Sequence, residues 1–199
     1  MLNIICYIAD IVLGVAMIEI NTEIMDLFFK KADSALDGEF AILGGSVLPL
    51  VGINTRVTLD IDLVNIHQES SGQNVLKLME IAQELGLPIE AINQAAAFFV
   101  YRIPGWQKNL IKVFDGKRAQ FYRTNSTLFV RLKISRMSET DLSDCIEMLR
   151  FAKKSKEFVD RKSLISIIGE ELEKNHNSAK MLRLETLNDR LQRGYTDEV

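Results

Sequence analysis

The sequence FAILGGSVLPLVGINTRVTLDIDLVNI, residues 40–66, contains a run in which polar and apolar side chains alternate. Residues 57–66 place Thr58, Asp60 and Asp62 at every second position, with apolar side chains between them. A period of two is typical of a β-strand, whose successive side chains point to opposite faces of the sheet. The sequence therefore predicts a strand over 57–66 that carries two carboxylates on one face.

Neighbouring carboxylates on one strand face repel each other unless a cation lies between them. Two residue rises separate the Cα atoms of Asp60 and Asp62 by roughly 6.5 Å, so their oxygens can converge on a shared site. Mg²⁺ takes oxygen ligands and is commonly held by one or two carboxylates plus substrate phosphates. We therefore expect a Mg²⁺ or Mn²⁺ site and metal-assisted phosphoryl transfer. The alternative is that both acids belong to the solvated face of an antiparallel sheet.

A Gly-Gly-Ser turn precedes this strand and is a candidate site for phosphate. The apolar residues 40–43 predict a short strand that ends at Gly44 and Gly45, and Ser46 is expected to cap a turn of helix through Leu50. Glycines permit close approach of a ligand to the backbone, and N–H groups at a helix start bind anions. The Ser46 hydroxyl would add a further donor.

Arg56 and Thr58 lead into the aspartate pair from the amino-terminal side. The Arg56 guanidinium could bind phosphate, and it would also offset the charge of the carboxylates.

The rest of the chain predicts an α+β protein with its strands in the amino-terminal half. Asp115-Gly116 lies between two apolar runs and favours a tight hairpin. Helical periodicity and capping residues predict seven helices, over residues 22–37, 73–85, 89–100, 126–136, 139–153, 161–174 and 178–192. We therefore expect a sheet domain over residues 1–124 and a helical carboxy-terminal segment over 125–199 that packs against it.

Composition excludes some classes of protein. The net charge of -3 gives no global basic surface for nucleic acid, so contact with a polynucleotide would be local. Cys6 and Cys145 have neither metal-ligand spacing nor a disulfide pattern, which fits a reducing cytoplasm.

His67 and His176 have no partners at ligand spacing and are expected at the surface. Trp106 follows a Pro-Gly turn and is expected to fill the edge of the core rather than to stack on a base.

Residues 1–17 are more apolar than the sequence that follows them. Asp10 interrupts the run, which is shorter than the ~20 residues that span a bilayer, and no basic segment precedes it. We therefore expect no membrane segment and no signal peptide here. Two alternatives stay open: an element packed on the core, or an upstream extension of a protein whose translation begins at Met17.

The two motifs together resemble a known superfamily. A Gly-Ser turn followed by a strand with an Asp-x-Asp pair is similar to the signature of the DNA polymerase β-like nucleotidyltransferases, and thirteen residues separate Ser46 from Asp60 here. LGGSVLPLVGINTRVTLDIDLV resembles, more narrowly, the small stand-alone bacterial members related to abortive-infection toxins. Their later signature is a lysine, a nearby arginine and two aspartates that open a helix. RLKISRMSETDLSDCIEML, residues 131–149, is similar to that signature.

The resemblance covers roughly residues 38–150 and implies a small mixed β-sheet flanked by helices. It also implies roles for individual residues. Asp60 and Asp62 would ligate the metals, and Gly45 and Ser46 would hold the nucleotide's phosphates. The later signature supplies Lys133 as a phosphate contact, with the second half of the site organised by Arg136, Asp141 and Asp144. The alternative for this later group is an ordinary ion pair of Arg136 with Asp141 at a helix start.

This sequence departs from the superfamily at one point. Many active members carry a third carboxylate on a later strand, and the nearest candidate here is Asp115. Because Asp115 precedes Gly116, its dipeptide favours a turn rather than a site residue.

The resulting expectation is a cytoplasmic, metal-dependent nucleotidyltransferase. It would move a nucleoside monophosphate from a nucleoside triphosphate to an acceptor hydroxyl on a transfer RNA, a protein or a small molecule. The resemblance further implies a toxin of a toxin–antitoxin pair, with an antitoxin protein as partner. The alternative is a catalytically inactive protein that keeps the fold for interaction or nucleotide binding. A third alternative is a structural or regulatory α+β domain whose aspartate pair is incidental.

Overall fold

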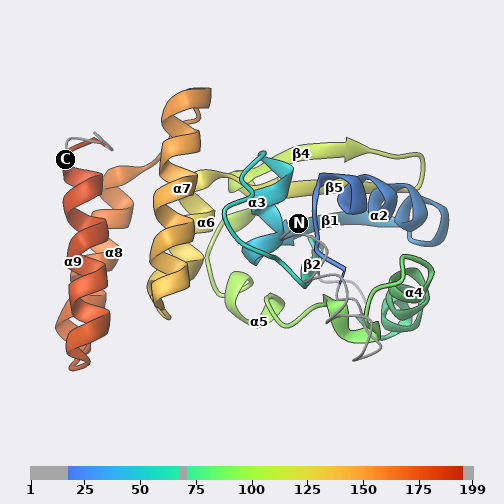
Figure 1. Ribbon diagram of the computed structural model, residues 1–199, viewed down its shortest axis with the longest axis horizontal. Helices are drawn as coiled ribbons and strands as arrows, with labels where there is room; N and C mark the ends of the chain where they lie inside the picture. The colour runs from blue at the N-terminus through green and yellow to red at the C-terminus, as the bar shows by residue number, and fades with distance from the viewer. Residues whose placement is uncertain (1–17, 68–70, 195–199) are drawn as a thin grey trace, which may run out of the picture.

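The structure is a computed structural model that describes residues 18–67 and 71–194 (Figure 1). The two alternatives for residues 1–17 therefore concern residues outside the described part of the chain. Figure 1 shows a sheet with α2 and α4 at one end of the molecule and the helices α6 to α9 at the other. This arrangement confirms the expected α+β fold, a mixed sheet flanked by helices and followed by a helical carboxy-terminal part.

The sheet has five strands in the order β3-β2-β1-β5-β4. β1 pairs antiparallel with β2 and parallel with β5, while β3 pairs parallel with β2 and β4 pairs antiparallel with β5. The strands are β1 (Gly38–Leu43), β2 (Ile61–Asn65), β3 (Ile92–Asn93), β4 (Leu110–Asp115) and β5 (Ala119–Thr124). The hairpin expected at Asp115-Gly116 is confirmed by the pairing of β4 with β5.

The helices of the carboxy-terminal half agree closely with the sequence pattern. α6 begins after the N-cap Asn125, and α7 begins with a capping box formed by Ser138 and Asp141. The helices are α2 (Thr22–Ala35), α3 (Val47–Leu50), α4 (Ser71–Glu84), α5 (Ala97–Val100), α6 (Ser126–Ile134), α7 (Glu139–Ser155), α8 (Arg161–Lys174) and α9 (Ser178–Gln192). Three short 3-10 turns lie at Gly44–Ser46, Ile89–Ala91 and Trp106–Asn109.

The helix predicted over residues 89–100 is wrong. Instead the chain forms a 3-10 turn, then the edge strand β3, and only then the short helix α5. Ile92 pairs with Ile61 of β2, so burial against the sheet overrides the helical preference of the alanine-rich segment.

The strand predicted over 57–66 is shorter than expected and begins at Ile61. Val57 and Leu59 are exposed, and the Thr58 carbonyl accepts a hydrogen bond from the Ile20 amide instead of from a sheet neighbour. The extended segment that carries Asp60 therefore runs beside residue 20 before it enters the sheet. Asp60 lies just before the strand, and Asp62 lies in it.

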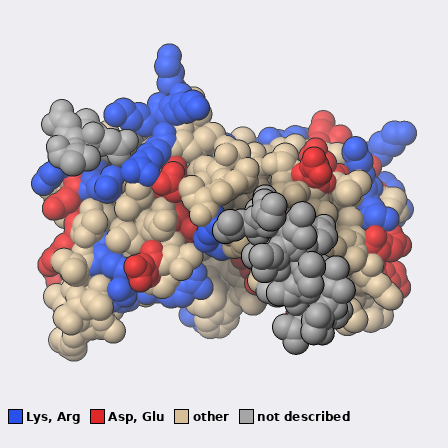
Figure 2. Space-filling model, in the orientation of Figure 1, with Lys and Arg blue, Asp and Glu red and all other residues tan. Residues whose placement is uncertain are grey.

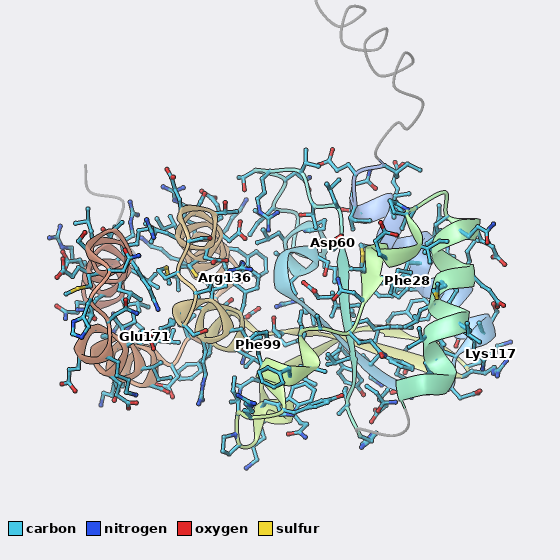
Figure 3. All side chains as sticks on the ribbon, turned by 90° about the horizontal axis from the view of Figure 1, so that it is seen from below. Phe28, Asp60, Phe99, Lys117, Arg136 and Glu171 are labelled. Atoms are coloured by element: carbon cyan, nitrogen blue, oxygen red, sulfur yellow. The ribbon has the colours of Figure 1, made fainter. Side chains whose placement is uncertain are left out.

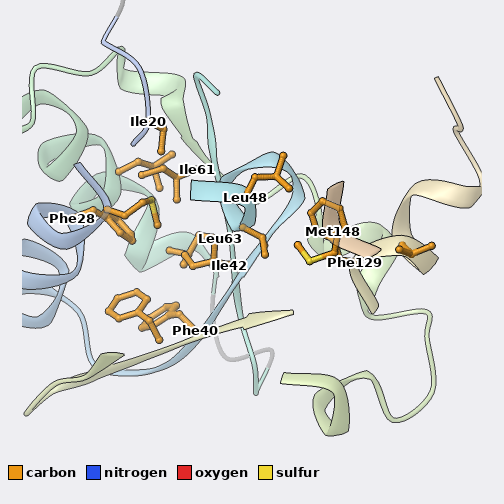
Figure 4. Close-up of a cluster of buried hydrophobic side chains, with 14 of the residues drawn as sticks. Ile20, Phe28, Phe40, Ile42, Leu48, Ile61, Leu63, Phe129 and Met148 are labelled. Carbon is orange, nitrogen blue, oxygen red and sulfur yellow. The ribbon is translucent and has the colours of Figure 1, made fainter. Parts of the chain in front are cut away.

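Alternation along β1 places two hydrophobic clusters on opposite faces of the sheet. Phe40 and Ile42 face the larger cluster with Phe28 of α2, and Figure 4 shows this cluster passing through Leu48 to Phe129 and Met148 of the helical part. Ala41 and Leu43 face a smaller cluster that includes Trp106. Because the larger cluster includes residues from α2 through α9, the sheet and the carboxy-terminal helices share one core. Trp106 is 2% exposed, which confirms its place in the core.

Charge is distributed unevenly over the surface (Figure 2). Lys and Arg side chains gather over the helical end of the face shown, whereas Asp and Glu are more scattered. At the junction of α7 and α8, the side chains of Lys153, Lys154, Lys156 and Lys162 are exposed. Within the described residues, no helix combines the length and apolar character needed to cross a membrane.

Candidate active site

A cavity of about 370 Å³ lies at the junction of the sheet and the carboxy-terminal helices. Figure 3 shows Asp60 on the sheet side and Arg136 on the helical side of this junction, with Phe99 nearby. Eight of the residues predicted from the sequence line the cavity, namely Gly44, Gly45, Arg56, Thr58, Asp60, Asp62, Lys133 and Arg136. The fold therefore brings together two motifs that are about 70 positions apart in the chain.

The acidic wall of the cavity consists of Asp60 and Asp62. Asp60 is exposed, whereas Asp62 is half-buried on β2. Burial, together with the negative charge of Asp60, raises the pKa of Asp62 above its ordinary value. An adjacent cation would offset this destabilisation, so Asp60 and Asp62 are the residues of the cavity that could hold a divalent metal ion.

Asn93 lies beside this wall and was not predicted from the sequence as a residue of the site. It pairs with Asp62 across β2 and β3, and the Asn93 side chain donates toward the Asp62 carboxylate and lowers its pKa. The Asn93 Oδ1 atom accepts a hydrogen bond of 3.2 Å from the Ala95 amide. The sequence pattern of residues 89–100 predicts a helix. The position of Asn93 beside Asp62 therefore becomes evident only from the pairing of β3 with β2.

The glycine turn is shaped by close approach of charged side chains. A Cβ atom at Gly44 would clash with Asp62 Oδ2, and a Cβ atom at Gly45 would clash with Arg56 Nη2. Gly44 also has φ +57, a left-handed conformation that favours glycine. The two glycines therefore allow the carboxylate and the guanidinium to approach the turn.

Ser46 differs from its expected position. Its side chain is fully buried, and its hydroxyl donates a 2.8 Å hydrogen bond to the Leu43 carbonyl and accepts one of 3.3 Å from the Asp62 amide. Ser46 makes no side-chain capping bond, so its expected role as a cap of α3 is wrong. The hydroxyl connects the turn to β2 and does not line the cavity.

Opposite Asp60 and Asp62 lies the basic wall of the cavity, in which the cations Lys133, Arg136 and Arg56 pair with the anions Asp141 and Asp144. Lys133 Nζ donates 2.9 Å hydrogen bonds to both Asp141 and Asp144. Arg136 forms two hydrogen bonds with Asp141, of 2.7 and 2.6 Å, and Arg56 forms two with Asp144, each of 2.9 Å. Three cations thus pair with two anions. The basic wall therefore carries one excess positive charge opposite Asp60 and Asp62.

Asp141 and Asp144 lie behind the cavity rather than in its lining, and both are buried. Burial alone would raise the pKa of Asp141, but hydrogen bonds and charge from Arg136 and Lys133 outweigh it and hold the pKa well below its usual range. Asp141 also accepts from the Ser138 amide as part of the capping box. The structure therefore contains the ion pair of Arg136 with Asp141, and the two aspartates position cations that do line the cavity.

The remaining candidates lie away from the cavity lining. Asp115 has a 70% exposed side chain in the β4–β5 hairpin and pairs with Lys112, which confirms the turn. His67 pairs with Glu39 at the surface, and His176 is exposed, so both surface positions are confirmed. Within the described residues, no group of three or more His, Cys, Asp or Glu side chains could hold a metal ion. Any metal site in this cavity would rest on the two carboxylates Asp60 and Asp62.

Comparison with known proteins agrees with this geometry. Residues 16–190 match a family model described as nucleotidyltransferase of unknown function (DUF6036). The chain belongs to this nucleotidyltransferase family. Its match includes both walls of the cavity and most of the carboxy-terminal helices, a wider span than the resemblance seen in the sequence. Neither a curated protein nor a solved structure matches the chain.

Proposed function

We propose that the protein is a metal-dependent nucleotidyltransferase that moves a nucleoside monophosphate from a nucleoside triphosphate to an acceptor hydroxyl. The supporting observation is the position of Asp60 and Asp62 in the same cavity as Lys133 and Arg136, beside the Gly44-Gly45 turn. Acids on one wall and cations on the other suit a triphosphate whose charge is shared between a metal ion and basic side chains.

Asp60 and Asp62 would hold Mg²⁺ or Mn²⁺, and the Asn93 amide, which donates toward Asp62, would orient that carboxylate. When bound, such an ion neutralises charge on the phosphates and polarises the phosphorus that is attacked. Burial and the charge of Asp60 raise the pKa of Asp62, and an adjacent cation would offset both effects, which supports this assignment.

The basic wall would bind the phosphates. Lys133 has three N–H donors, and two are used by Asp141 and Asp144, which leaves one for a ligand in the cavity. The Arg136 side chain is 72% exposed, and its bonds to Asp141 use Nε and Nη2. Arg56 is more fully engaged, because it also donates to the Val57 carbonyl. We assign phosphate contact to Lys133 and Arg136, and a positioning role to Arg56.

The reaction forms a bond between the acceptor oxygen and the α-phosphorus and breaks the bond to the pyrophosphate. Asp60, as the exposed acid of the pair, is the candidate to accept the proton of the attacking hydroxyl. The acceptor would be the end of a transfer RNA, a protein side chain or a small molecule. In a toxin–antitoxin setting, the protein would be the toxin and a separate antitoxin would restrain it.

The proposal is tested with nucleoside triphosphates labelled at the α- or the γ-phosphate, incubated with the protein, Mg²⁺ and each acceptor class. We expect the α label, and not the γ label, to enter a larger product, and Asp62→Asn to abolish this transfer. Equal incorporation by wild type and Asp62→Asn would contradict the proposal. For the toxin role, expression of wild type should arrest growth, whereas Asp62→Asn should not.

A second candidate is an inactive member of the family that binds a nucleotide without transferring it. Asn93 favours it, because an amide supplies less charge to a metal than a carboxylate would at that position. This candidate predicts binding of triphosphate to the cavity with no labelled product under Mg²⁺ or Mn²⁺.

A further inference from the structure

Two adjacent phenylalanines are exposed on α5 beside the cavity. Phe98 and Phe99 are each 58% exposed, whereas the phenylalanines of the core, such as Phe40 and Phe121, are fully buried. Phe99 lines the cavity, and Figure 3 shows it close to the junction where Asp60 and Arg136 lie. Large exposed rings at the rim of a cavity suggest contact with a ligand rather than a role in folding.

The pair is held in place by contacts of its own. The Arg102 guanidinium carbon lies 3.7 Å from the centroid of the Phe98 ring. The centroids of Phe98 and Phe99 lie 5.3 Å apart, with an angle of 89° between the ring planes. Phe98 is therefore fixed between Arg102 and Phe99, while Phe99 is the ring of the pair that borders the cavity.

The lining of the cavity combines charged and apolar side chains. The charged side chains are Arg56, Asp60, Asp62, Lys133 and Arg136. The apolar side chains are Leu43, Leu59, Ala95, Ala96, Phe99 and Leu132. A nucleotide combines the same two characters, because a flat, largely apolar base is joined through a sugar to a charged triphosphate.

We propose that Phe99 is the stacking face for the base of the nucleotide bound in this cavity, an inference that rests on the proposed function. Base–aromatic stacking tolerates any base, since every base has a flat π-face. Phe99 would then add affinity for the nucleoside part of the substrate without choosing strongly among bases. Arg102 acts through Phe98 and keeps the pair in position.

The inference is tested by tryptophan fluorescence of a Phe99→Trp variant. The chain has a single tryptophan, Trp106, which is 2% exposed, so quenching by an added nucleotide reports on position 99. With Mg²⁺ present, each nucleoside triphosphate should quench the variant, and inorganic tripolyphosphate should not. The matched control is Phe158→Trp, because Phe158 is 77% exposed and outside the cavity lining; its fluorescence should not change.

Calorimetric titration of Phe99→Ala supplies the energetic arm. We expect binding of nucleoside triphosphate to weaken by about 5- to 150-fold, as for the loss of one base–aromatic stack, with tripolyphosphate binding unchanged. If Phe99→Ala binds nucleotide as tightly as wild type and Phe99→Trp is not quenched, Phe99 does not stack on the base. The nucleotide site itself would not be contradicted by this result. Equal loss of both ligands would also overturn it, since Phe99 would then shape the whole cavity. If wild type binds neither ligand, the proposed function fails, and this inference fails with it.

Discussion

Arg56 and Asp144 lie 88 positions apart in the chain, and two hydrogen bonds of 2.9 Å join them. Arg56 Nε donates to Asp144 Oδ1 and Nη2 donates to Oδ2, so the guanidinium and the carboxylate form a bidentate salt bridge. The same carboxylate accepts from Lys133. Asp144 therefore connects the loop before β2 with the basic wall of the cavity.

The first prediction concerns this connection. Because Asp144 is 1% exposed and pairs with two cations, Asp144→Ala should lower the free energy of unfolding by about 3–5 kcal/mol. Chemical denaturation measures this loss. The control on the same helix is Glu147→Ala, which removes an i,i+3 pair with Arg150 and should cost under about 1 kcal/mol. Equal losses for the two variants would contradict the role given to Asp144.

The second prediction concerns the glycine turn. Gly44 has a left-handed backbone conformation, and a Cβ atom there would clash with the Asp62 carboxylate. Gly44→Ala should therefore displace this carboxylate, destabilise the fold and reduce nucleotide binding. Gly45→Ala should displace the more flexible Arg56 and cost less stability. In α8, a Cβ at Gly169 would meet nothing within 4 Å, so Gly169→Ala should stabilise by about 0.5–1 kcal/mol. Thermal denaturation with and without nucleotide tests all three variants.

A third prediction follows from Asn93. In Asn93→Asp, one oxygen can still accept from the Ala95 amide while the other adds negative charge beside Asp62. We expect metal-free stability at neutral pH to fall by about 1–2 kcal/mol, because a further like charge faces Asp62. Mn²⁺ binding should tighten by about tenfold or more, since a third carboxylate would face the ion. Calorimetry that finds unchanged or weaker Mn²⁺ binding would contradict a position of residue 93 beside the metal.

The fourth prediction is a pH dependence of stability away from the cavity. Burial alone would raise the pKa of Glu157, but hydrogen bonds from Arg123 and Ser126 outweigh it and hold the pKa below its ordinary value. A carboxylate with a lowered folded-state pKa stabilises fully above its unfolded pKa, and this contribution is lost as pH falls through the folded value. Stability should therefore decline below about pH 4.5.

Denaturation between about pH 6 and pH 3 checks this sign. Glu157→Gln should be less stable than wild type at pH 6 and should lose less stability on acidification. The control Glu84→Gln alters an exposed pair with Lys31 and should leave the pH profile nearly unchanged. A Glu157→Gln profile parallel to that of wild type would contradict the assignment.

Local sequence was sufficient to predict much of the fold. Asp115-Gly116 identified the hairpin, and the N-caps Asn125 and Ser138 fixed the start of two helices. The helix predicted over 89–100 failed because β3 exists only through its pairing with β2, which no local pattern reveals. For the same reason, the strand over 57–66 was predicted too long: residues 57–60 have the alternation of a strand but pair with no strand among residues 18–67 and 71–194.

The site was predictable where its residues are neighbours in the sequence. Asp60 and Asp62 are close because a single residue of extended chain, Ile61, lies between them, and the position of Asp141 follows from its place at the start of α7. By contrast, Phe99 reaches the cavity through the position of α5, and Asn93 reaches Asp62 through the pairing of β3 with β2. The Ser46 hydroxyl bonds to Leu43 and Asp62 and does not line the cavity. Such positions depend on tertiary contacts rather than on motif spacing.

The central claim is that Asp60 and Asp62 together hold a divalent cation. Electron paramagnetic resonance of Mn²⁺ titrated into the protein tests it most directly, because free and bound Mn²⁺ give different signals. The Asp60→Asn, Asp62→Asn double variant should lose the tightest Mn²⁺ site, whereas Asp115→Asn, which alters an exposed hairpin acid, should keep it. If the double variant binds Mn²⁺ as tightly as wild type, the two aspartates are not the metal site and the proposed mechanism is contradicted.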